Sequence, residues 1–221
     1  MRGSMRKIVS MLLIAVMLLA FVGCGNSKSG DKEKFVGTWN ATLDMTDVLN
    51  ESLREGIAEE DETMADYFSV DKFDFVVEFT FNEDGTYSTT VDEASLNRSS
   101  DALKASVKDG LMRYFEDMVA EMDLDMSVED LLDLSGRSID ALLDEALPTD
   151  LFDDVLDEFR LKGNWKAENG KLHTTESVDE SIDKNAYELY EFTSNGDIKL
   201  SLVDDSEDES GVFPMILKKV N

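Results

Sequence analysis

The chain of 221 residues carries 49 acidic and 21 basic side chains, which gives a formal net charge of −28 at pH 7. Such an acidic surface repels phosphate groups and argues against a nucleic-acid-binding protein. The chain has one cysteine and one histidine, which excludes an internal disulfide and argues against a zinc site. Because 42% of the residues are apolar, a folded core is expected in spite of the charge.

The N-terminal segment has the composition of a secretory signal. Three basic residues occur among the first seven, and a largely apolar stretch follows over residues 8–22. That stretch is shorter than the roughly 20 apolar residues of a comfortable membrane span. A short apolar segment behind positive charges is typical of a signal peptide. Met5 is an alternative start to Met1, because Arg6 and Lys7 follow it directly.

Cys24 ends this segment in the sequence Phe21-Val22-Gly23-Cys24, which resembles the lipobox of bacterial lipoproteins. Phe21 stands where that family usually has Leu. The resemblance implies that the Cys24 sulfur carries a diacylglyceryl group and that cleavage follows Gly23. Palmitate-like acyl chains would then hold the protein on the outer side of a bacterial membrane, at the cell surface. An uncleaved anchor with an incidental cysteine is the alternative.

We therefore expect a lipoprotein signal peptide over residues 1–23, a polar and flexible tether over 24–34, and a folded domain over 35–221. Removing the signal peptide takes away basic residues and no acidic ones. An anionic bilayer would not attract the remaining chain, so the lipid would have to provide the anchoring.

The folded domain contains about eight segments with the residue pattern of β-strands. In the clearest, 73–81, every second residue is apolar, as in a half-buried antiparallel strand. Its apolar residues are Phe73, Phe75, Val77, Phe79 and Phe81. Turn signals such as Asn169-Gly170 separate neighbouring strands. The predicted strands are 35–43, 73–81, 86–91, 163–168, 171–175, 186–193, 197–203 and 212–220.

Two helical insertions interrupt the strands. The first, 46–60, has apolar residues at a spacing of four. The second, 94–162, begins with a helix that has one apolar face. A capping box at Ser127, a helix over 139–147 and a last helix over 150–159 follow it. We expect these acidic helices to bury their apolar faces, and the second insertion to leave and re-enter at one end. The face of its first helix comprises Leu103, Val107, Leu111, Phe115, Met118 and Met122.

Four sequence elements resemble the lipocalin-like (calycin) domains of many bacterial lipoproteins. These elements are Gly37-Thr38-Trp39, the hairpin 79–87, Gly163-Asn164-Trp165 and Leu217-Lys218-Lys219. The resemblance implies an α+β fold, an antiparallel up-and-down β-barrel of about eight strands with the helical insertion 94–162 between the third and fourth. That insertion has no counterpart in the ordinary lipocalin pattern. The insertion between the first two strands is placed like the helical lid of fatty-acid-binding proteins.

The resemblance also implies a plug at one end of the barrel. In this family Gly37 would allow a close approach of the chain, and Trp39 would close the barrel. A basic residue from the last strand, Lys218 or Lys219, would lie across the Trp39 ring in a cation–π contact.

No catalytic signature is present, and we expect no enzyme activity, no cofactor and no metal. His173 alternates away from Leu172 and is expected to face solvent, where it could not serve a nucleophile. The acidic run in 204–210 lacks the spacing of a known calcium loop. It is interpreted as a solvated loop, with calcium binding as the open alternative.

Two functions remain. The first is a non-catalytic binding module, in which the barrel interior holds a small apolar or amphipathic ligand; the same side chains would otherwise simply fill the barrel. The second is an interaction protein of the cell surface, whose acidic helical insertion docks a partner protein. Besides the ligand or the partner protein, the only expected partner is the membrane, which holds the protein through its lipid anchor. The candidate lining residues are Phe75, Val77, Phe79, Ile198 and Leu200.

Overall fold

The computed structural model describes residues 31–58, 62–123, 125–147, 152, 156–157, 159–203 and 212–220. Cys24, the predicted signal peptide and the acidic loop 204–210 lie outside the described residues, as does most of the helix predicted over 150–159. The chain divides into two compact units. Among the described residues, the helical unit comprises Met45–Phe73 and the part of Asn97–Asp153 that is described, and the barrel unit comprises the remainder.

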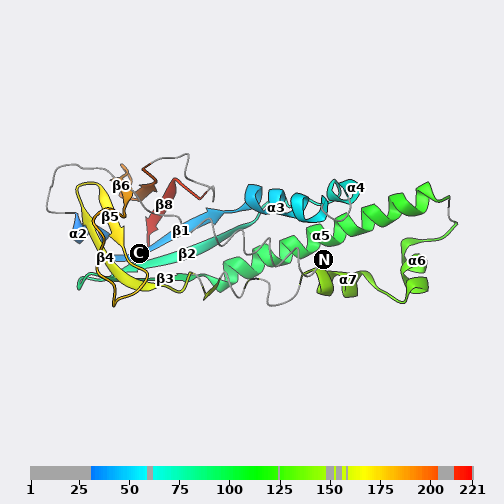
Figure 1. The fold of residues 1–221 in the computed structure, drawn as a ribbon, viewed down its shortest axis with the longest axis horizontal. Coiled ribbons are helices and arrows are strands. Elements are labelled where there is room, and N and C mark those ends of the chain that lie inside the picture. The colour runs from blue at the N-terminus through cyan, green and yellow to red at the C-terminus, as the bar shows by residue number, and fades with distance from the viewer. Residues whose placement is uncertain are drawn as a thin grey trace. The chain divides into compact units, whose positions relative to one another are not determined.

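Eight antiparallel strands of the barrel unit close into a barrel in sequence order, and β8 pairs back onto β1 (Figure 1). The described part therefore confirms the predicted eight-stranded antiparallel barrel in an α+β chain. Closure leaves no strand edge open for pairing with another chain. The strands are β1 (Gly37–Asp44), β2 (Asp74–Phe81), β3 (Thr86–Val91), β4 (Lys162–Glu168), β5 (Lys171–Thr174), β6 (Glu188–Phe192), β7 (Ile198–Ser201) and β8 (Met215–Lys219).

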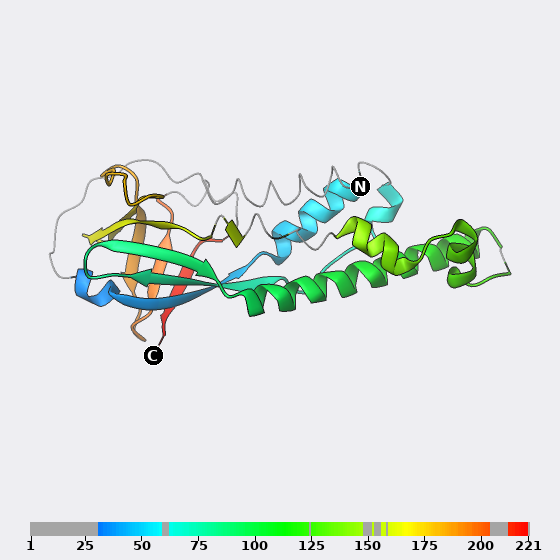
Figure 2. The ribbon, with the colours of Figure 1, turned by 90° about the horizontal axis from the view of Figure 1, so that it is seen from below.

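The two ends of the barrel differ in their connections. Because neighbouring strands are antiparallel, successive connections alternate between the ends. The turn end carries the short connections 82–85, 169–170 and 193–197, together with the helix α2 (Lys32–Phe35), which is blue beside the start of β1 in Figure 2. Four longer connections begin and end at the insertion end, namely 45–73, 92–161, 175–187 and 202–214.

The helical unit contains both insertions. The first insertion forms α3 (Thr46–Ala58) and α4 (Glu62–Ala65), which lie between β1 and β2. The second forms α5 (Glu93–Glu121), α6 (Val128–Ser135) and α7 (Ile139–Ala146), which lie between β3 and β4 as predicted. The predicted capping box is present: Ser127 Oγ accepts a hydrogen bond from the Asp130 amide at 3.1 Å, and the Asp130 side chain accepts one from the Ser127 amide.

A close approach fixes the first insertion against α5. A side chain at Gly110 would place its Cβ 2.6 Å from the Tyr67 carbonyl oxygen, so only glycine fits there. Arg113 Nη2 donates to the same carbonyl at 2.9 Å. The Tyr67 hydroxyl donates to Asp117 Oδ2 at 2.6 Å. Gly110, Arg113 and Asp117 are three and four residues apart and lie on one face of α5. Together they hold the part of the first insertion that contains Tyr67.

The far part of α5 packs on α6 and α7 through a small apolar cluster around Val119, Val128 and Leu132. On the predicted apolar face, Leu103, Val107 and Leu111 are buried. The prediction is wrong for Met122, which is 59% exposed. The reason is that α5 ends at Glu121, so the helical spacing no longer applies at Met122.

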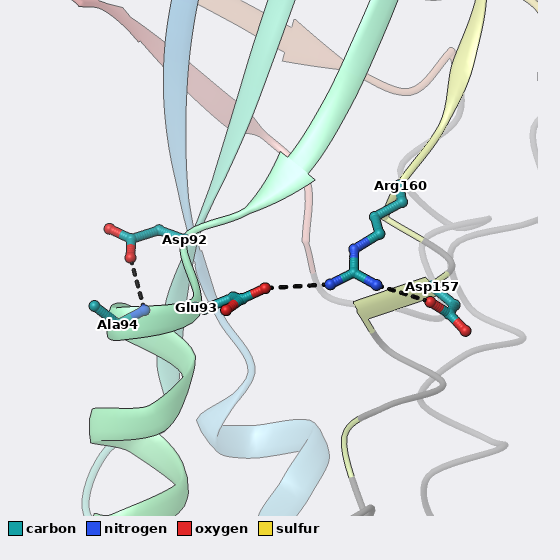
Figure 3. Close-up of polar contacts among 5 residues, drawn as sticks. All are labelled: Asp92, Glu93, Ala94, Asp157 and Arg160. Carbon is teal, nitrogen blue, oxygen red and sulfur yellow. Dashed lines mark hydrogen bonds and ion pairs between the residues drawn. The ribbon is translucent and has the colours of Figure 1, made fainter.

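The second insertion leaves and re-enters the barrel unit at adjacent points (Figure 3). Arg160 Nη2 lies 3.2 Å from Glu93 Oε1 at the start of α5, and Arg160 Nη1 lies 3.1 Å from Asp157 Oδ1. Asp92 Oδ1 accepts hydrogen bonds from the Ala94 and Ser95 amides at 2.9 and 3.1 Å, which caps α5.

A buried threonine joins the same two segments. Thr89 Oγ1, on β3, donates to the Phe159 carbonyl at 2.5 Å and accepts from the Leu161 amide at 3.2 Å. The two ends of the insertion are therefore held together by hydrogen bonds as well as by ion pairs. This agrees with the expectation that the insertion leaves and re-enters at one end.

Candidate ligand site in the barrel

Aromatic side chains fill the interior at the turn end. Phe35, which the sequence pattern had placed in a strand, ends α2 and is fully buried. Its ring meets four others, mostly edge to face, as aromatic pairs prefer. The ring centroids of Tyr190, Phe81, Trp165 and Phe192 lie 4.8, 5.5, 5.6 and 5.6 Å from that of Phe35. The Tyr190 hydroxyl also donates to Asp31 Oδ2 at 2.8 Å, which ties α2 to β6.

Trp39, on β1, lies beside the last strand and is hydrogen-bonded to the backbone of Phe35. It is 1% exposed, and its Nε1 donates to the Phe35 carbonyl at 2.6 Å. Lys219, its partner across the β1–β8 pair, places Nζ 5.2 Å from the Trp39 ring centroid. Lys218 instead pairs with Asn40, one position out of phase with Trp39.

Gly37 makes room for this lysine. Its φ is +129°, a conformation that L-residues with side chains rarely adopt. A Cβ at Gly37 would lie 3.3 Å from Lys219 Cε. Gly37, Trp39 and Lys219 therefore form one contact at the turn end, in which the glycine leaves space for the cation beside the indole.

The second Gly-x-Trp element works in the same way, although the sequence alone gave it no role. A Cβ at Gly163 would lie 1.8 Å from the Thr175 carbonyl oxygen and 2.8 Å from Tyr87 Cε1, so no side chain fits there. Trp165, two residues on, is buried, and its Nε1 donates to the Asn82 carbonyl at 3.2 Å. Both motifs thus combine a close approach of the backbone with a buried indole.

The five candidate lining residues belong to two strands on the barrel wall. Phe75 and Val77 on β2 are buried, as are Ile198 and Leu200 on β7. Phe79 is half-buried, and its ring stacks on Phe81 with centroids 6.4 Å apart.

On the insertion-end side of Tyr190 along β6, Glu188 introduces a carboxyl group into this apolar interior. It is the first residue of β6 and only 6% exposed, on the face that it shares with buried Tyr190, while Leu189 and Glu191 are exposed. Its partner on β5 is buried Leu172. Oε2 of Glu188 has no hydrogen-bond partner among the described residues. Burial raises the pKa of this carboxyl to about 7, against the weaker lowering effect of a hydrogen bond from its own backbone.

Tyr87, on β3, is a second polar side chain of the interior, and it lies beside Phe81 of the aromatic cluster. Its hydroxyl donates to the Thr175 carbonyl at 2.9 Å. Burial raises the pKa of Tyr87 to about 12, and the negative charge of Glu188 contributes to the shift. Tyr87 and Glu188 therefore interact electrostatically inside the barrel.

Sequence reasoning missed Glu188. The sequence does contain one signal for it: period-two alternation along the strand puts Glu188 on the same face as Tyr190 and Phe192. Glu191 and Leu189 alternate equally well, so the pattern alone does not say which face is inside.

The prediction that His173 faces solvent is wrong, because its side chain is 3% exposed. The alternation itself holds, since His173 pairs with exposed Lys166 while Leu172 lies inside. The connection between β5 and β6 covers the outer face at this point. His173 Nδ1 lies 2.9 Å from the Ala186 carbonyl oxygen, and its ring centroid is 5.6 Å from that of Tyr187.

The described residues outside the barrel interior include no metal-binding cluster and no membrane-spanning helix. Within the described ranges, His, Cys, Asp and Glu side chains form no group of three or more that could hold a metal ion. None of the helices in the described part is long and apolar enough to cross a membrane. The chain matches no family model, and comparison with curated proteins and with solved structures gives no significant match.

Proposed function

We propose that this protein is an extracytoplasmic lipoprotein, tethered to a bacterial membrane, whose lipocalin-like barrel binds a small apolar or amphipathic ligand without catalysing a reaction. The observation that carries the proposal is the closed eight-stranded barrel with an apolar interior, filled by aromatic rings at the turn end. A barrel of eight strands is just wide enough for its own side chains or for one small ligand.

The connections support a ligand entrance at the insertion end. The turn end carries short hairpin turns and is filled by Phe35 and Trp39, whereas the longer connections all lie at the insertion end. Binding residues concentrate on long connections held by a rigid scaffold, and the mouth of a barrel is a common ligand site.

The contact among Gly37, Trp39 and Lys219 supports the lipocalin-like assignment. It has the glycine, the buried indole and the late-strand cation that the sequence resemblance implies. The membrane tether rests on the sequence around Cys24. Replacing that cysteine by serine, as Cys24→Ser, should release the protein from membrane fractions, because the thiol is the acylation site in lipoboxes. Unchanged membrane association would contradict the lipid anchor.

Native mass spectrometry of the purified full chain tests the binding function. We expect a mass increment from a retained small molecule that disappears on denaturation. The variant Ala41→Phe adds volume at a fully buried position of the interior and should lose the increment. Thr42→Phe adds the same side chain at the exposed neighbouring position and should keep it. An unliganded mass, together with no binding of the small ligands tested below, would contradict the proposal.

A second candidate is an interaction protein of the cell surface, in which the acidic helical insertion docks a partner. The exposure of Leu134 on α6, at 75%, and of Met122, at 59%, favours it. A Leu134→Glu variant should then lose a partner that cross-links to the native chain on cells, while Val220→Glu, an exposed apolar position of the barrel unit, should keep it.

A further inference from the structure

Glu188 is a buried carboxyl group of which one oxygen has no partner among the described residues. Two other buried polar side chains of the barrel unit are paired: the Tyr87 hydroxyl donates to the Thr175 carbonyl, and Thr175 Oγ1 donates to the Ser177 carbonyl at 2.7 Å. Glu188 Oε2 has no such partner among the described residues. A buried carboxyl group with one unpaired oxygen lowers the stability of a protein, so the packing of the barrel does not account for this residue.

The position of Glu188 within the barrel points to a ligand. It begins β6, so it lies on the insertion-end side of Tyr190, whose ring packs in the aromatic cluster of the turn end. It faces inward opposite Leu172. A molecule entering from the insertion end would therefore meet the free carboxyl oxygen before it met the filled end.

We propose that Glu188 is the polar anchor of the ligand site and that the ligand is an amphipathic cation, with an ammonium group on Glu188 Oε2 and an apolar body among the interior side chains. This inference rests on the proposed function and names the class of ligand. A buried carboxylate is compensated best by a positively charged donor, since a charge-assisted hydrogen bond is stronger than a neutral one.

Two further observations favour a cation. The net charge of −28 attracts cations over long range and repels fatty acids and other anions. The interior that holds Glu188 is rich in aromatic side chains, Tyr87 and Tyr190 among them, and aromatic rings attract an organic ammonium group. A neutral alcohol can donate to Glu188 as well, but it leaves the carboxylate charge uncompensated.

Calorimetric titration of the purified full chain with n-octylamine, 1-octanol and octanoate tests this inference. The three probes share one apolar chain and differ in the head group. The native protein should bind n-octylamine at least about tenfold more tightly than 1-octanol, the ratio expected of a charge-assisted contact, and octanoate least. The variant Glu188→Gln should lose that preference and keep the affinity for 1-octanol. Glu191→Gln, which removes the exposed carboxylate on the same strand, should keep the preference.

The proton balance gives an independent measurement. At about pH 6 the Glu188 carboxyl is largely protonated, so binding the ammonium ion should release up to about one proton, and at about pH 8.5 it should release almost none. Titrations in buffers of different ionisation enthalpy measure this number, and Glu188→Gln should abolish the release at the lower pH.

The outcomes distinguish a failure of the cation inference from a failure of the proposed binding function. If 1-octanol binds and n-octylamine binds no better to the native protein than to Glu188→Gln, the cation inference is wrong and the binding function stands. If none of the three probes binds, both are wrong.

Discussion

The two ends of the barrel interior are built in different ways. At the turn end, aromatic rings pack on one another, and the polar atoms of Trp39, Trp165 and Tyr190 have partners. Towards the insertion end, Glu188 has a carboxylate oxygen with no partner among the described residues. The first arrangement stabilises the fold, whereas the second lowers its stability. The difference separates the part of the barrel that holds the fold from the part that we propose binds the ligand.

The largest expected effect is at the turn end. Trp39→Ala removes a fully buried side chain and its hydrogen bond to Phe35, so it should lower the free energy of unfolding by about 3–5 kcal/mol. Urea denaturation followed by the fluorescence of Trp165, the other tryptophan of the chain, measures the change in the barrel unit. A loss below about 1 kcal/mol would show that Trp39 does not stabilise the turn end.

The next effect is at the insertion end and depends on pH. Burial raises the pKa of Glu188 from 4.5 to about 7, so in this window the folded protein keeps a proton that the unfolded chain has lost. The free energy of unfolding should therefore fall as the pH rises from about 4.5 to 7, by up to about 3 kcal/mol, and should level off above that.

Glu188→Gln isolates this contribution from the other acidic groups. The difference in unfolding free energy between the native protein and Glu188→Gln, measured without ligand, should shift in favour of the variant by up to about 3 kcal/mol between pH 4.5 and pH 8. Glu191→Gln, on the outer face, should show no such shift. A pH-independent difference for Glu188→Gln would mean that the carboxyl is solvated or paired in the folded protein.

The smallest effect concerns the cation beside Trp39. Lys219→Met keeps the apolar stem and removes the charge that lies 5.2 Å from the Trp39 ring centroid, which should cost about 0.5–1 kcal/mol. Lys218→Met, on the neighbouring exposed position opposite Asn40, should have almost no effect. Equal losses in the two variants would indicate a general effect of charge and no specific contact at the turn end.

Much of the barrel could be predicted because it is encoded locally. The alternation in 73–81 marks β2 almost to the residue. Asn169 and Gly170 have φ values of 62° and 76°, the left-handed conformations that an Asn-Gly hairpin turn requires. The capping box at Ser127 likewise depends on residues three apart.

The errors occur where distant segments decide the environment of a residue. The phase of β5 was predicted correctly, but His173 is buried because the connection around Ala186 and Tyr187 covers the outer face. Phe35 continues a strand-like pattern, yet it ends a short helix because its ring packs on Tyr190 and Phe192, more than 150 positions later in the chain. Glu188 was missed for the same reason, since only the closed barrel shows which face of β6 is inside.

Hydrogen exchange of the full chain, with and without saturating n-octylamine, tests the contrast between the two ends most directly. The amides around Glu188, and those of Ser201 and Leu202, should exchange more slowly when the ligand is present, because it orders the insertion-end part of the interior. The amides of Trp39 and Phe81, at the filled turn end, should be unchanged. Slower exchange at the turn end alone, or at neither end, would contradict the account.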